Sequence, residues 1–154
     1  MPLSTSLSSR LEFQHQTIDE LIEGYSEEQL KIRTIPDKWS AFENIAHLVS
    51  YQLVFQERIV RILLESNPSF HRYVAENDPS FSEYVQYSLK HLREILFDAR
   101  HQISRQLHDL PNNQLALTGQ HPLFGRLSLI QWTEFFLLHE AHHLFTIFKL
   151  VANR

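Results

Sequence analysis

The 154-residue sequence contains no cysteine, which excludes disulfide bonds, cysteine-based zinc sites and a cysteine nucleophile. This absence fits a reducing compartment, and we expect a cytoplasmic protein. Glycine is scarce as well, with three residues in the whole chain, which favours helices and argues against glycine-rich phosphate loops. Long apolar runs and a basic, apolar leader are also missing, so we expect neither a membrane span nor a signal peptide.

The charged residues form no basic patch. Fourteen lysines and arginines are scattered among 18 acidic residues, which leaves a formal charge of −4. Proteins that bind nucleic acids usually cluster their basic residues along one face or in one arm. We therefore expect no nucleic acid as partner.

Apolar residues recur with a spacing of about 3.6 along most of the chain, which is typical of amphipathic helices. The spacing predicts long helices over residues 4–25, 40–65, 80–110 and 128–151, and a short helical turn over residues 26–31. Capping boxes mark the predicted helix starts, in the pairs Ser26/Gln29, Ser40/Glu43, Ser80/Glu83 and Ser128/Gln131. We see no strand, repeat or linker. The chain is thus predicted to be one all-α domain over residues 1–154, a four-helix bundle with long crossover connections at 66–79 and 114–126.

The last predicted helix is apolar on nearly all sides. Such a helix is expected to be buried on most of its faces, either at the centre of a bundle or in a homodimer. It also contains His139 and His143, which are four residues apart and so share one helix face within an apolar stripe. Buried imidazoles need partners for their nitrogens. The pair is therefore either a metal site or two core histidines bonded to other protein groups.

The segment from His139 to His143 also matches the H-E-x-x-H motif of zinc metalloproteases. Such an enzyme needs a third ligand, commonly after the motif, and residues 144–154 contain no histidine, aspartate or glutamate. It also needs a sheet beside the helix, and we expect none. The sequence thus argues against a protease of this class.

The best candidate for a third ligand is His47, in the second predicted helix. The face of that helix that carries His47 also carries Tyr51 and Arg58, and it is more polar than the opposite face. Spacing alone leaves two interpretations open. The face is either exposed to solvent or lines a polar pocket between helices.

Two segments resemble the DinB/YfiT-like family. The stretch from Lys38 to Leu48, with Trp39-Ser40 before His47-Leu48, resembles the start of that family's second helix. The stretch from His121 to Gly125, followed by His139 to His143, resembles the approach to its last helix. The resemblance implies a four-helix bundle in which three histidines bind one divalent ion, zinc or nickel. The matching positions here are His47, His139 and His143.

Three neutral imidazoles leave at least one coordination position open, which is typical of catalytic sites. Glu140 is then a candidate general base, or it orients a ligand, or it forms a helix–helix ion pair. We expect His142 and Tyr51 to line the pocket or pack against it, and His121 to lie in the loop before the last helix.

The resemblance also implies a function, that of an enzyme with a small-molecule substrate. Family members include metal-dependent hydrolases and transferases that use a low-molecular-weight thiol as cosubstrate. Because this chain has no cysteine, such a thiol must come from outside. The alternative is a non-catalytic metal- or ligand-binding bundle, or a stress-response dimerisation module. An open coordination position in a pocket would favour the enzyme.

Overall fold

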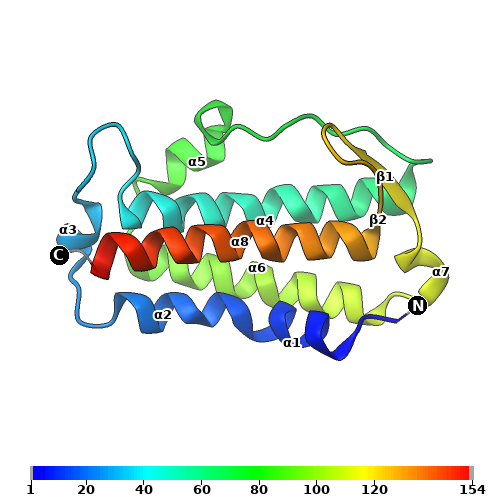
Figure 1. Cartoon of the computed structure of the whole chain (residues 1–154), viewed down its shortest axis with the longest axis horizontal. Helices are drawn as coiled ribbons and strands as arrows, with labels where there is room; N and C mark the ends of the chain where they lie inside the picture. The colour runs from blue at the N-terminus through cyan, green and yellow to red at the C-terminus, as the bar shows by residue number, and fades with distance from the viewer. Residues whose placement is uncertain (1, 153–154) are drawn as a thin grey trace.

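Two 24-residue helices, α4 (Ala41–Leu64) and α8 (Leu129–Ala152), pack against each other along their length. They belong to a computed structural model of the chain that describes residues 2–152. Helix α6 (Leu89–Asp109) packs on α4, and a rod of α1 (Thr5–Phe13), the 3₁₀ turn η1 (Gln14–Gln16) and α2 (Thr17–Ile22) completes a four-helix bundle (Figure 1). The predicted fold class is confirmed.

The rods do not simply alternate in direction. The α1–α2 rod and α8 run one way, while α4 and α6 both run the other way (Figure 1). The connection at 65–88 must therefore cross back along the bundle, whereas the connection at 110–128 stays at one end. Of the two long connections predicted as crossovers, the first crosses the bundle and the second does not.

Two predicted helices are broken in the structure. The first is interrupted by η1, and the third divides into α5 (Pro79–Tyr84) and α6. The expected cap at Ser80 is wrong, because Ser80 lies inside α5 and donates its backbone N–H to Asp78 at its start. Ser88 instead caps α6 by accepting a hydrogen bond from the backbone of His91. The short helix α3 (Glu27–Lys31) has the predicted capping box.

The expectation of no strands is also wrong. After the short helix α7 (Asn112–Leu115), strands β1 (Thr118–His121) and β2 (Gly125–Ser128) form an antiparallel hairpin. Gly125 has a φ of 72°, a conformation that favours glycine at the end of such a turn. The first connection joins the hairpin, because Phe70 donates its N–H to the carbonyl of Gln120. The two connections thus meet over one end of α4 and α8, whereas the 3₁₀ turn η2 (Ala75–Asn77) lies further along the bundle, beside α5.

The core consists of two apolar clusters with a polar layer between them. One cluster includes Ile45, Leu96 and Ile147, and the other includes Phe55, Ile103 and Phe136. The layer is formed by buried side chains of three helices: Gln52 of α4, Arg100 of α6 and Glu140 of α8. Arg100 donates to Gln52 and to Glu140, so these polar groups satisfy one another.

Helix α8 is less buried than its composition suggested. Leu138, Phe145 and Phe148 are about half exposed or more. The prediction of burial on most faces is wrong for this stripe, because α8 packs against the bundle on one side and no helix of residues 2–152 covers the other (Figure 1). Within residues 2–152, no helix is both long and apolar enough to cross a membrane.

Candidate metal centre

The structure brings His47 of α4 together with His139 and His143 of α8. Each of the three rings offers a nitrogen atom within 4.8 Å of the other two. The Nε2 atoms of His47 and His139 lie 3.2 Å apart. The trio arises because α4 and α8 are in contact and because His139 and His143 are one helical turn apart.

This arrangement fits a divalent ion. Zinc–imidazole bonds of about 2.0–2.1 Å in a tetrahedral shell place ligand nitrogens about 3.3–3.4 Å apart. The separation of 3.2 Å between the Nε2 atoms of His47 and His139 is close to this spacing. Because imidazole nitrogens suit zinc, nickel, copper and iron, the donor set does not choose the metal.

Packing alone does not explain these rings. The Nδ1 atoms of His47 and His139 are buried and have no hydrogen-bond partner in the described part of the chain. A buried polar nitrogen without a partner costs free energy. Within the described residues, packing gives each of these two rings one polar contact, between their Nε2 atoms, and a bound ion would use both of those nitrogens.

Burial also keeps the three rings neutral. Loss of water lowers the pKa of His47 to about 4, of His143 to about 3 and of His139 to about 2. Repulsion between the rings lowers the last two further. At neutral pH their nitrogen lone pairs are therefore available to a metal without competition from protons.

His143 is held by a further contact. Its Nδ1 lies 2.8 Å from the side-chain oxygen of Asn44, which accepts a hydrogen bond from it. The proton is thus on Nδ1 in the neutral ring, and Nε2 keeps its lone pair for a ligand. Asn44 was not among the site residues predicted from the sequence, although it lies three residues before His47 and shares its side of α4.

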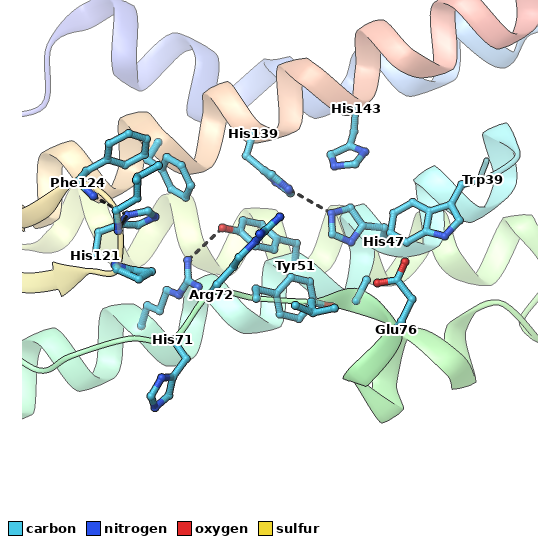
Figure 2. A pocket seen from close by; sticks show the side chains of 17 residues that line it. Trp39, His47, Tyr51, His71, Arg72, Glu76, His121, Phe124, His139 and His143 are labelled. Atoms are coloured by element: carbon cyan, nitrogen blue, oxygen red, sulfur yellow. Dashed lines mark hydrogen bonds between the residues drawn. The ribbon is translucent and has the colours of Figure 1, made fainter. Parts of the chain in front are cut away.

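The cluster forms one wall of a cavity of about 790 Å³ (Figure 2). Aromatic rings surround the cluster. The ring centroids of Trp39 and Tyr73 lie 5.1 Å and 5.7 Å from that of His47, and the centroid of Tyr51 lies 4.0 Å from that of His139. Segment 71–76 and segment 121–124, from the two connections, complete the lining. Of the two interpretations of the His47 face, the pocket is correct, since His47 is buried and both Tyr51 and Arg58 line the same cavity.

The remaining candidates lie in different places. Glu140 is buried away from the cavity lining, and its carboxylate accepts hydrogen bonds from Arg100 and Gln14. These are the contacts of a helix–helix ion pair, one of the roles that the sequence left open. His142 is exposed and does not line the cavity, whereas His121 does.

Comparison with known proteins agrees with the fold. The solved structure with the description "YfiT from Bacillus subtilis is a probable metal-dependent hydrolase with an unusual four-helix bundle topology" is similar to this chain, with a TM-score of 0.83 and 17% identity. The similarity covers 96% of this chain and 85% of that one. No curated protein matches the sequence. The family model described as DinB superfamily matches residues 10–147, and the chain therefore belongs to that superfamily.

Proposed function

We propose that this chain binds one divalent ion, zinc or nickel, through His47, His139 and His143 and acts as a metal-dependent enzyme on a small molecule. The observation that carries the proposal is the convergence of three neutral imidazoles on the wall of an open cavity. The description of YfiT as a probable metal-dependent hydrolase is consistent with it.

When bound, an ion with three imidazole ligands supplies a Lewis acid that lowers the pKa of a water molecule or a thiol. The chain's own residues prepare the site for it. Asn44 fixes the tautomer of His143, and burial keeps all three rings unprotonated. Trp39, Tyr51 and Tyr73 cover the cluster with aromatic surface and so limit the water that reaches it.

Two reaction classes fit this site. In a hydrolase, the cavity holds the substrate beside an activated water. In a transferase, it holds the thiolate of a low-molecular-weight cosubstrate, since the chain has no thiol of its own. Product formation with and without an added thiol, in a screen of ester, amide and electrophilic substrates, separates the two classes.

The metal site itself is tested by elemental mass spectrometry on untagged protein. We expect about one ion per chain in the wild type and none in the variant His139→Ala/His143→Ala. His142→Ala is the matched control, because His142 lies on the same helix but is exposed. No bound ion after incubation with zinc or nickel, or an ion retained by the double variant, would refute the site.

The cytoplasmic location and the homodimer, both predicted from the sequence, remain predictions. The exposed apolar residues Leu138, Phe145 and Phe148 on α8 support the homodimer. Sedimentation equilibrium tests it, and a monomer at all concentrations would contradict it.

A further inference from the structure

Arg58 is a buried cation without an acidic partner. Only 6% of its surface is exposed, yet it forms no ion pair within the described residues 2–152. The other deeply buried arginine, Arg100, is 1% exposed and is paired with Glu140. Burying an unpaired charge is costly. The chain compensates one buried guanidinium and leaves the other, which lines the cavity, uncompensated.

Neighbouring groups hold Arg58 in place but do not neutralise it. Its guanidinium carbon lies 5.0 Å from the ring of Trp132 and 5.7 Å from the ring of Phe70. One Nη atom donates to the hydroxyl of Tyr51 at 3.0 Å. Burial raises the pKa of Tyr51, so this hydroxyl stays neutral. A guanidinium has five N–H groups, of which one bonds to Tyr51, and among the described residues no nitrogen of Arg58 is buried without a partner. Because Arg58 lines the cavity, its remaining N–H groups are available to a molecule bound there.

A second hydrogen-bond donor lies beside it. His121 lines the same cavity, and its ring centroid lies 5.2 Å from that of Trp132. The guanidinium of Arg58 packs on the same indole ring. The Nδ1 of His121 accepts the backbone N–H groups of Leu123 and Phe124, at 3.1 Å each. The proton of the neutral ring is therefore on Nε2, which leaves His121 as a donor.

Tyr51 lies between this end of the cavity and the histidine cluster. Its ring centroid is 4.0 Å from that of His139, and its hydroxyl accepts the hydrogen bond from Arg58. Figure 2 shows His121 and Phe124 at one end of the pocket, Tyr51 in the middle and the three histidines beyond it. Because Arg58, His121 and the three histidines line one cavity, a single bound molecule can contact both groups.

We propose that Arg58, with His121, binds an oxyanion of the substrate, a carboxylate or a phosphate, while the reacting group lies at the histidine cluster. A guanidinium fork matches both oxyanions. The position of the reacting group at the histidine cluster rests on the proposed function, whereas the anion site at Arg58 does not. It identifies the substrate class as an anionic molecule with an apolar body that fits the aromatic walls.

The test measures binding to the full chain by calorimetry, after bound metal has been removed by chelation and dialysis. The probes are 3-phenylpropionate, 2-phenylethylphosphonate and the uncharged 3-phenylpropionamide. We expect at least one of the two anions to bind about tenfold tighter than the amide or better. Which anion binds tighter identifies the oxyanion.

The variant Arg58→Gln should reduce the affinity for the anion to that for the amide, and Arg58→Lys should retain part of the preference. Arg72→Gln is the matched control, because Arg72 lines the same cavity but is exposed. In this variant the ratio of anion to amide affinity should change less than about twofold. An amide that binds as tightly as both anions in the wild type would overturn the proposal, whether or not the variants fold. A full preference in Arg58→Gln would overturn it too. Because the protein is free of metal, a failure of the metal site leaves this test unaffected.

Discussion

The side chain of Asn44 links the start of α4 to His143. Its oxygen accepts from His143 Nδ1 at 2.8 Å, and its nitrogen donates to the carbonyl of Ser40 at 2.8 Å. Ser40 is the N-cap of α4, where its side chain and that of Glu43 form a capping box. The cap that begins the helix therefore also fixes which end of the Asn44 amide faces the candidate ligand.

Asn44→Leu should weaken metal binding without abolishing it. Loss of the partner that orients a ligating histidine typically costs about 10–100-fold in affinity. Asn44→Asp keeps an oxygen acceptor for His143 but loses the hydrogen bond to Ser40, so it should lose less metal affinity than Asn44→Leu. Competition with a chromophoric chelator measures both constants. An unchanged affinity in Asn44→Leu would show that the hydrogen bond does not tune the site.

Glu140→Gln should destabilise the fold while leaving the metal content at one ion per chain. The substitution leaves Arg100 buried without a countercharge, and breaking a buried pair in this way costs about 3–5 kcal/mol. Urea denaturation measures the change in the free energy of unfolding.

The double variant Arg100→Met/Glu140→Leu is the control, because it removes both charges and should recover much of that loss. The same variants separate the two roles of Glu140 once a substrate is known. Activity per folded molecule that survives in Glu140→Gln agrees with the ion pair, whereas a loss of several orders of magnitude would identify a general base.

His15 should make the fold sensitive to acid. It is buried against Phe97, and burial lowers its pKa to about 3, with a further contribution from Arg100. Below its ordinary pKa near 6.5, the unfolded chain binds a proton that the folded chain does not. Stability therefore rises with pH in this range and is lost as the pH falls from about 6.5 towards 3, by up to about 1.4 kcal/mol per pH unit.

Urea denaturation of metal-free protein at several pH values measures this loss. His15→Phe should flatten the pH dependence between pH 6 and 4 relative to the wild type. The cluster histidines titrate in the same direction and contribute equally to both proteins, so the difference belongs to His15. Identical slopes for the two proteins would contradict the prediction.

The sequence predicts the histidine pair well because the relation is local. His139 and His143 are one turn apart on a helix whose existence the apolar spacing makes clear. The identification of His47 needed the family resemblance, since no local rule says which face of α4 meets α8. The same limit applies to Glu140, whose partners Arg100 and Gln14 come from other helices.

The helix breaks were missed for a different reason. Apolar residues at Tyr84, Val85 and Leu89 continue the helical spacing across the end of α5, and all three pack on the same core cluster. Periodicity therefore does not register the turn, although Ser88 is available as a cap. The hairpin was missed because its strands are four residues long and only partly buried, and so show little alternation.

Gly119→Ala should loosen the contact between the hairpin and the first connection. A Cβ atom at this position would lie 2.7 Å from Cε2 of Phe70 and 3.1 Å from Cγ1 of Ile62. Such overpacking typically costs about 1–3 kcal/mol, which urea denaturation measures. Phe70→Leu removes the closest atom, so the double variant should lose less stability than the two single variants together. Strictly additive losses would mean that the clash is relieved elsewhere and that the hairpin does not depend on this close approach.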